Sequence, residues 1–450
     1  MYKGNELVSV VMTTYNRECT LLNSINSVLN QTYTNIQFII VDDCSTDNTS
    51  KILSGISDPR VEIIRLPENR HISYATDKGF ELIKGDFVAL IDSDDQWKSN
   101  KLEVQLEYMK SHPEHQGCFT WMDAIDENGN DQNEKYFVYK CMFSSHTDTQ
   151  EEWLRFFFFK GNKLVNPSSL VTARAAKIIG KHNSFMTQAP DLDWWVRFTK
   201  KFSFGVIEEP LVNLCISDDN ESGYVSINNS RRIRFYNELM QIRYHFFDDI
   251  DRDLFIRTFK DDFVCRDSFT DDELKCEQAF LILKPFENCH TNSALALLKF
   301  EELMNNPITE ELLWTKYKFG TRQVAKYTGM NLYFDHYAEE AYEKTPKLKE
   351  ENDNLKLLRR KTEEKCKQKL YSMEVVSSIV KSNNKLLEDY SKSLNKKLKE
   401  ANEEIKRLNS INSNLNTEYK KVIDSLNTVV NSSSWRITAP LRNLKDKNKK

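Results

Sequence analysis

The sequence predicts an α/β domain built on a doubly wound sheet, followed by a helical domain and a long coiled coil. Three observations indicate this order. Short apolar runs alternate with helical stretches from Leu7 to about Tyr224, aromatic-rich helical sequence follows, and an apolar seven-residue repeat fills the last part of the chain. We expect the segments to be residues 1–228, 229–345, 346–430 and 431–450, the last being a basic tail.

Four unbroken apolar or β-branched runs mark strands in the first segment, at residues 8–12, 36–41, 61–66 and 87–91. Such runs are typical of strands that are covered on both faces. Between the first two runs, Leu22, Ile25 and Leu29 recur at helical spacing. Strands separated by helices indicate βαβ units and a doubly wound sheet, whose ligands lie at the carboxyl ends of the strands.

The second segment, residues 229–345, is aromatic-rich and compatible with helices, as in RRIRFYNELMQIRYHFF (231–247). It contains no chemical motif. We expect a helical domain that packs on or beside the first one.

The third segment carries an apolar position every seven residues from Met373 to Val429, and a second series from Leu398 to Leu426 completes an a/d seam. This pattern predicts a coiled coil. Asn412 in an a position is a polar interruption of the kind that favours a parallel dimer, so we expect a parallel homodimer. A helical hairpin within one chain is the alternative, but about 60 residues without a turn signal argue against it.

Composition and cysteine usage favour a cytoplasmic protein. The nine cysteines include no CxxC pair, which is typical of reduced thiols. The first residues lack the layout of a signal peptide, and the most apolar patch, residues 153–161, is too short to span a membrane and is predicted to be core. A net charge of −4 gives no field that would attract nucleic acid, so we expect no nucleic-acid partner.

Three carboxylates, Asp92, Asp94 and Asp95, follow the run at 87–91. They could cap the turn after the strand, since short acidic side chains accept hydrogen bonds from free backbone donors. They could belong to a phosphoryl-accepting receiver domain, in which one strand ends in two acids and a later strand in another. In such a domain the strand with two acids comes first, whereas here the run at 8–12 precedes the run that ends at Asp42 and Asp43. In a third interpretation, two carboxylates one residue apart hold Mg²⁺ or Mn²⁺, whose remaining positions take diphosphate oxygens and water.

Four blocks, read in order, resemble the family 2 glycosyltransferases, which have a GT-A fold. They are VSVVMTTYNR (8–17), SVLNQTYTNIQFIIVDDCSTDNT (27–49), ENRHISYATDKGFELIKGDFVALIDSDDQW (68–97) and APDLDWWVRF (189–198). The resemblance covers roughly residues 7–220. It implies a nucleotide-sugar-binding GT-A domain with a mixed sheet, a nucleoside-diphosphate sugar as donor and a divalent cation, Mn²⁺ or Mg²⁺, as cofactor.

The resemblance also assigns roles to single residues. Thr14 and Tyr15 match residues that line the nucleotide pocket, and Asp43 matches the acid that hydrogen-bonds the base. Asp92 matches the acid that contacts the ribose or the metal shell, and Asp94 the direct metal ligand.

The same blocks imply residues on the acceptor side. Asp95 and Trp97 match positions that continue the acidic motif toward the acceptor. Asp191 matches the second residue of the family's acidic pair and would be the general base that takes the acceptor's proton. Asp191 has a simpler interpretation as well, because together with Asp193 it could open an amphipathic helix, where acids favour the dipole.

Several positions depart from the family pattern. Thr13 stands where Pro is usual, Cys44 and His71 where Gly is common, and Pro190 where an acid is usual. Thr76 and Asp77 replace a frequent Arg-Asn pair, and Cys215 and Ser217 replace Arg and His that hold the diphosphate in many members. The missing positive charge could come from Arg70, His71 or Lys78, or the metal could carry more of that role.

These observations lead to one main hypothesis and one alternative. The main hypothesis is an inverting, metal-dependent glycosyltransferase that acts on a glycan or lipid-linked acceptor of a bacterial surface polysaccharide. The alternative is a glycosyltransferase-like scaffold without activity that pairs with another synthase through its coiled coil. The ending SSSWRITAPLR resembles a tail found after coiled coils in some bacterial glycan-assembly transferases. The basic residues after it are either solvated or in peripheral contact with anionic lipid at the inner face of the cell membrane.

Overall fold

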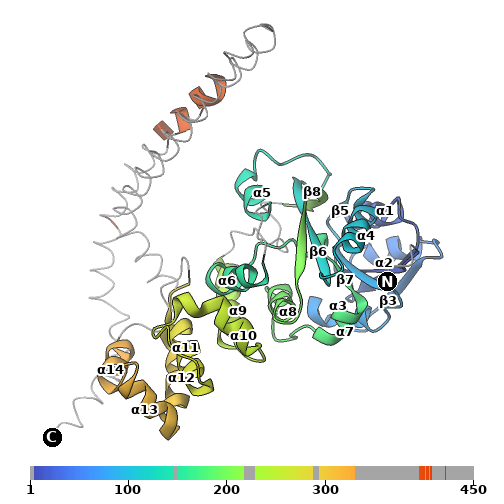
Figure 1. Cartoon of the computed structure of the whole chain (residues 1–450). Helices are drawn as coiled ribbons and strands as arrows, with labels where there is room; N and C mark the ends of the chain where they lie inside the picture. The colour runs from blue at the N-terminus through green and yellow to red at the C-terminus, as the bar shows by residue number, and fades with distance from the viewer. Residues whose placement is uncertain are drawn as a thin grey trace, which may run out of the picture. The chain divides into compact units, whose positions relative to one another are not determined.

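The computed structural model describes residues 5–144, 149–216, 229–286 and 293–329, and the short C-terminal pieces 395–400, 402–404, 406–407 and 421 (Figure 1). The chain divides into two compact units, Met1–Tyr333 and Phe334–Lys450. The sheet and the helices from α1 to α14 belong to the first unit.

One sheet of eight strands forms the centre of the first unit, in the order β3-β2-β1-β4-β7-β6-β8-β5. Strands β1 to β4 pair in parallel, whereas β4–β7, β7–β6 and β8–β5 pair antiparallel and β6–β8 parallel. The predicted mixed, doubly wound sheet is therefore confirmed. The strands are β1 Val8–Thr14, β2 Ile36–Asp42, β3 Val61–Arg65, β4 Phe87–Asp92, β5 Gln96–Trp97, β6 Gly117–Ile125, β7 Leu170–Thr172 and β8 Phe204–Cys215.

Helices cover both faces of the sheet. Successive residues of a strand point to opposite faces, so Val8, Val10 and Met12 of β1 join one apolar cluster and Val11 joins another. The first cluster contains α1 (Leu21–Leu29), α2 (Thr49–Ser54) and α4 (Lys101–Ser111), and lies near α5 (Phe137–Phe143). The second contains α3 (His71–Phe80), α6 (Gln150–Lys160), α7 (Ala173–Ile179) and α8 (Pro190–Thr199).

Helix α3 lies unusually close to β1. A Cβ added at Gly79 would stand 2.4 Å from Cγ1 of Val11, so only glycine allows this approach. The contact holds the first turns of α3 beside the carboxyl ends of β1 and β4.

The helix predicted between the first two strands is confirmed as α1, but two details differ from the sequence pattern. In α1 the buried residues are Leu21, Ser24, Ile25 and Val28, whereas Leu22 is 47% exposed. Strand β3 is not covered on both faces, because it is the edge strand of the sheet and Ile63 is exposed.

The region after residue 228 is helical where the structure describes it, as predicted. Its helices are α9 Asn229–Tyr244, α10 Arg252–Phe259, α11 Asp271–Leu283, α12 Ser293–Met304, α13 Pro307–Thr315 and α14 Thr321–Thr328, with the short 3-10 turn η2 Lys260–Asp262. A second 3-10 turn, η1 Asn166–Ser168, precedes β7 in the α/β region. The predicted core patch lies in α6, where Phe158 packs against Phe246, Phe247 and Phe259 at ring-centroid distances of 5.0, 5.0 and 5.5 Å. The helices thus share the apolar cluster of α6 and α8.

The predicted coiled coil and tail lie almost entirely outside the described residues. The described pieces between 395 and 421 are helical. The segment boundaries, the coiled coil and the homodimer stay predictions. Among the described residues, no helix combines the length and the apolar content that crossing a membrane requires.

Candidate active site

The carboxyl ends of β1, β2 and β4 meet at one edge of the sheet. In the parallel register Thr13 lies opposite Asp92 and Thr14 opposite Asp42. The backbone N–H of Asp43 donates to the Thr14 carbonyl at 2.9 Å. The chain runs outward from β1 to β3 and returns to β4, so this edge is the switch point where doubly wound sheets bind ligands.

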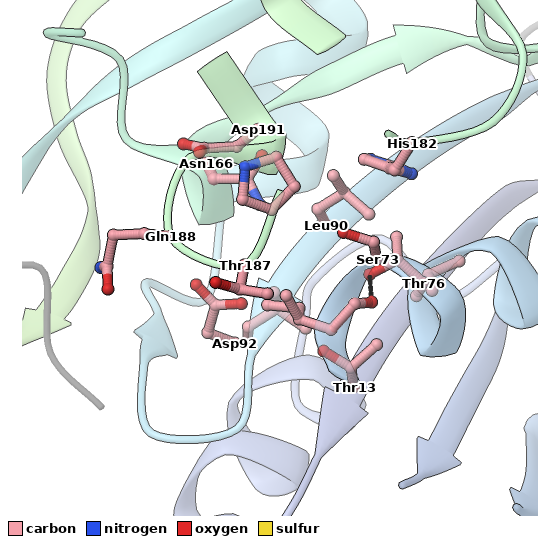
Figure 2. Close-up of a pocket in the computed structure, with 14 residues that line it drawn as sticks. Thr13, Ser73, Thr76, Leu90, Asp92, Asn166, His182, Thr187, Gln188 and Asp191 are labelled. Atoms are coloured by element: carbon pink, nitrogen blue, oxygen red, sulfur yellow. Dashed lines mark hydrogen bonds between the residues drawn. The ribbon is translucent and has the colours of Figure 1, made fainter. Parts of the chain in front are cut away.

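A cavity of about 160 Å³ lies beside this edge (Figure 2). Its walls come from the ends of β1 and β4, the first turns of α3, and the segment that leads into α8. Polar lining residues include Ser73, Thr76, Asp92, His182, Thr187 and Asp191. The structure thus brings the predicted metal-side carboxylate of Asp92 and the predicted base Asp191 to one cavity.

Asp92 and Asp94 are half-buried carboxylates whose charges interact. Burial, followed by the negative charges of Asp94 and Asp191, raises the pKa of Asp92 to about 7, and Arg17 opposes the shift. Burial also raises the pKa of Asp94, although Arg17 lies with its Nε 3.5 Å from Asp94 Oδ2. The cluster therefore favours a nearby positive charge.

Asp95 and Trp97 make structural contacts. The Asp95 carboxylate is 2% exposed and accepts a hydrogen bond from the Cys215 backbone N–H at 2.8 Å, which ties β4 to the end of β8. Trp97 is buried and donates its indole N–H to the Pro167 carbonyl at 2.9 Å. Neither residue lines the cavity. Their predicted acceptor-side roles stay predictions.

The three predicted nucleotide contacts lie at the same edge but outside the cavity. Thr14 is buried, and its hydroxyl oxygen has no hydrogen-bond partner among the described residues. Tyr15 is exposed. Burial raises the pKa of Asp43, whose carboxylate accepts the Arg70 backbone N–H at 2.8 Å. A buried hydroxyl without a partner beside a carboxylate suits a polar ligand.

Asp191 stands in the first turn of α8, directly after Pro190 at the start of the helix. Its Oδ2 accepts a hydrogen bond from Asn162 Nδ2 at 3.1 Å. The neighbouring Asp193 pairs instead with Arg197 at 2.9 Å along the same helix. The two acids therefore differ, because Asp191 lines the cavity while Asp193 does not.

The proposed replacements for the missing positive charge do not line the cavity. Arg70 lies over the Tyr74 ring at 4.2 Å, and Lys78 pairs with Glu81 at 2.8 Å. Sequence reasoning missed Arg17, although it ends the first family block. Cys44 and His71, which stand where Gly is common, both have left-handed backbones with φ of 63° and 64°. Ser217 lies outside the described residues.

Sequence reasoning also missed Glu238 and His182. Glu238 belongs to α9, is 5% exposed and accepts hydrogen bonds from the backbone N–H groups of Thr187, Gln188 and Ala189 at 2.9, 2.8 and 2.7 Å. His182 lines the cavity with its Nδ1 2.8 Å from Asp77 Oδ1. No local motif marks either residue, since each partner is far away in the sequence.

The carboxylates of Asp92 and Asp94 fit a hard divalent cation. Oxygen donors are the ligands that Mg²⁺ and Mn²⁺ prefer, and a cation would offset the repulsion within this cluster. Among the described residues, no group of three or more His, Cys, Asp and Glu side chains is arranged to hold a metal. A bound diphosphate and water would supply further oxygen ligands.

Similarity to known proteins is concentrated in this α/β region. The family model described as Glycosyl transferase family 2 matches residues 9–181. An uncharacterised glycosyltransferase of Methanocaldococcus jannaschii is 31% identical over 235 residues, which are 51% of this chain and 77% of that protein. The chain belongs to glycosyltransferase family 2. It is therefore a glycosyltransferase, and its mixed sheet is the GT-A domain of the family.

Other similar proteins of this kind match shorter segments or diverge further. The UDP-Glc:alpha-D-GlcNAc-diphosphoundecaprenol beta-1,3-glucosyltransferase WfaP of Escherichia coli is 37% identical over 106 residues, 24% of this chain and 42% of that protein. The chain thus matches less than half of that relative's length. The solved structure of S. aureus TarS 1-349 in complex with UDP-GlcNAc has a TM-score of 0.44 and 16% identity, covering 73% of this chain and 93% of that one.

Proposed function

We propose that this family 2 glycosyltransferase is an inverting, metal-dependent enzyme of bacterial surface-polysaccharide biosynthesis. It moves a sugar from a nucleoside-diphosphate sugar to a hydroxyl group of a growing glycan or lipid-linked acceptor. The observation that carries the proposal is the cavity shared by Asp92 and Asp191. The name of the E. coli relative, with UDP-Glc as donor and a diphosphoundecaprenol-linked acceptor, supports the substrate class.

In this mechanism Asp191 takes the proton of the acceptor hydroxyl. The acceptor oxygen bonds to the anomeric carbon as the bond from that carbon to the diphosphate oxygen breaks, and attack from the opposite face inverts the configuration. The Asn162 amide orients Asp191 in the first turn of α8. Asp92 and Asp94 would hold Mn²⁺ or Mg²⁺, which supplies Lewis-acid stabilisation of the departing diphosphate.

The test compares three variants with the unmodified protein. We expect Asp191→Asn to lower the rate of sugar transfer about 100-fold or more, because an amide cannot accept the proton. Asp94→Ala should abolish metal-dependent transfer. Asp193→Asn is the matched control. Asp193 lies two residues after Asp191 in the same helix but pairs with Arg197, so this variant should keep most of the activity. Full activity of Asp191→Asn would remove this residue as the base.

A binding experiment separates the enzyme from an inactive scaffold. Calorimetric titration with UDP, GDP and dTDP in the presence of Mn²⁺ should detect binding of at least one nucleotide, and binding should weaken when the metal is chelated. Absence of any metal-dependent nucleotide binding would favour the scaffold.

A further inference from the structure

We propose that the cavity between Asp92 and Asp191 accepts an uncharged sugar with free hydroxyl groups and discriminates against sugars that carry a carboxylate or a phosphate. The inference rests on the proposed function, because it assigns this cavity to the transferred sugar. Two features of the lining support this substrate class: three wall hydroxyls donate their hydrogens into the protein, and the described lining contains carboxylates but no lysine or arginine.

Three hydroxyl groups of the lining donate their hydrogens into the protein. Ser73 donates to the Met186 carbonyl at 3.0 Å, Thr76 to the Ile72 carbonyl at 2.8 Å, and Thr187 to the Glu238 carboxylate at 2.9 Å. Carbonyl oxygens carry no hydrogen, and Glu238 acts as an acceptor through both carboxylate oxygens, so each hydroxyl must be the donor. A hydroxyl has one hydrogen. Toward the cavity these residues therefore present only lone pairs.

The backbone N–H groups of the same wall also donate into the protein. The successive N–H groups of Thr187, Gln188 and Ala189 could cradle an anion at the start of α8, but all three donate to Glu238. The carboxylate of Glu238, which comes from α9, thus occupies the place that a ligand's carboxylate or phosphate would take.

The charged groups around the cavity also disfavour an anionic ligand. Asp92 and Asp191 both line it, whereas no lysine or arginine does so among the described residues. His182 is the lining residue that could become cationic, but its Nδ1 faces Asp77 at 2.8 Å, so the pair has no net positive charge in either state of the ring. Arg17 pairs with Asp94 and lies outside the lining.

These walls suit the hydroxyl groups of a neutral sugar. Each sugar hydroxyl can donate its hydrogen to a lone pair of Ser73, Thr76 or Thr187, or to a carboxylate. A sugar carboxylate has no hydrogen to donate, and the lining donors that remain, the side chains of Thr13, Asn166 and Gln188, are uncharged. It would therefore leave water without gaining a cationic partner in return. Discrimination follows from the acceptors contributed by Ser73, Thr76 and Thr187 and from the absence of a lysine or arginine in the described lining.

The experiment uses pairs of donors that differ only at one carbon. The full-length protein is titrated calorimetrically in the presence of Mn²⁺ with UDP-glucose and UDP-glucuronate, with GDP-mannose and GDP-mannuronate, with dTDP-glucose and dTDP-glucuronate, and with UDP, GDP and dTDP alone. We expect the neutral donor of the pair whose nucleotide binds to have a Kd at least ten times lower than its uronate. Equal or tighter binding of the uronate overturns the inference and leaves the proposed function standing, whereas absence of all nucleotide binding overturns the proposed function itself.

A variant tests whether the walls cause the preference. Thr76→Lys places a cation on the cavity wall and gives up only a hydroxyl-to-carbonyl bond within α3, so it should reduce the preference for the neutral donor about tenfold. Glu81→Lys is the control, because it changes the charge by more at the far end of α3, outside the cavity. An unchanged preference in a folded Thr76→Lys protein would count against the inference. The donor comparison on the unmodified protein holds even if this variant fails to fold.

Discussion

Two left-handed residues, Cys44 and His71, shape the loops around the nucleotide edge of the site. Cys44 follows the Asp42–Asp43 pair, and His71 begins α3 next to the Arg70 N–H that Asp43 accepts. A residue with a Cβ pays about 1–2 kcal/mol for a left-handed backbone, a conformation that glycine adopts without strain.

We predict that Cys44→Gly and His71→Gly each raise the free energy of unfolding by about 0.5–1 kcal/mol. Relief of the strained backbone exceeds the extra entropy that glycine gives the unfolded chain. Urea unfolding of the full-length protein measures the change. Glu68→Gly serves as control, because this exposed residue of the same loop has no left-handed backbone, and it should lower stability slightly. Destabilisation by both loop substitutions would show that the backbone there is not strained.

Single residues show how far the sequence could predict the site. The acidic motif and the later PDLDWW segment singled out Asp92 and Asp191, and the structure brings both to one cavity. Their roles stay predictions. Arg17 and Glu238 were missed, since their importance depends on contacts with Asp94 and with residues 187–189 that are remote in the sequence. Asp95 was singled out by its place in the acidic motif, but the motif did not reveal that its carboxylate accepts a hydrogen bond from the Cys215 N–H.

At the scale of elements, the link between α9 and the start of α8 has the clearest consequence for activity. Glu238 holds three successive N–H groups of the segment that leads into Asp191. We therefore assign Glu238 as a positioning residue that acts through the cavity wall. Helix α9, like the wall segment 187–191, lies after the part of the chain that the family model matches.

We predict that Glu238→Gln lowers kcat at least tenfold. Its amide NH₂ would face N–H donors, which leaves buried groups unpaired at a cost of about 1–3 kcal/mol. Glu277→Gln is a matched control, because Glu277 is a fully buried helical residue that likewise accepts two backbone N–H groups, from Val264 and Cys265, and the hydroxyl of Ser268. Both variants should lose similar stability in thermal unfolding. Equal kcat values per folded molecule would remove the positioning role.

The sheet shows which elements the sequence could predict. Strands β1, β2 and β4 are continuous apolar runs, and each was found within two residues of its observed ends. The other half of the sheet was not recognised. Strand β8 contains Glu208, Glu209 and Pro210, β7 has three residues, and the pairing of β6 with β8 shifts register near Trp121. Such strands are specified by their neighbours in the sheet more than by their own periodicity.

At the scale of the whole molecule, the catalytic unit and the C-terminal unit pose separate questions. The first unit contains the cavity, the candidate base and Glu238, so catalysis does not require residues beyond Tyr333 in our proposal. The described helical pieces of the second unit carry ion pairs within one chain, between Lys396 and Glu400 and between Arg407 and Glu404. Leu398, a predicted seam position, is 59% exposed in the single chain. An exposed seam leucine is expected when a partner helix covers it.

We therefore predict that the full-length protein is a parallel homodimer through residues 398–429. Multi-angle light scattering at micromolar concentration should give twice the monomer mass. Leu408→Glu combined with Leu415→Glu places charges in the seam and should yield a monomer, because buried unpaired carboxylates oppose association. Ser410→Glu combined with Thr417→Glu adds the same charges on the outer face and should leave the dimer intact. A monomeric mass for the unmodified protein would refute the dimer, and a dimeric seam variant would place the interface elsewhere.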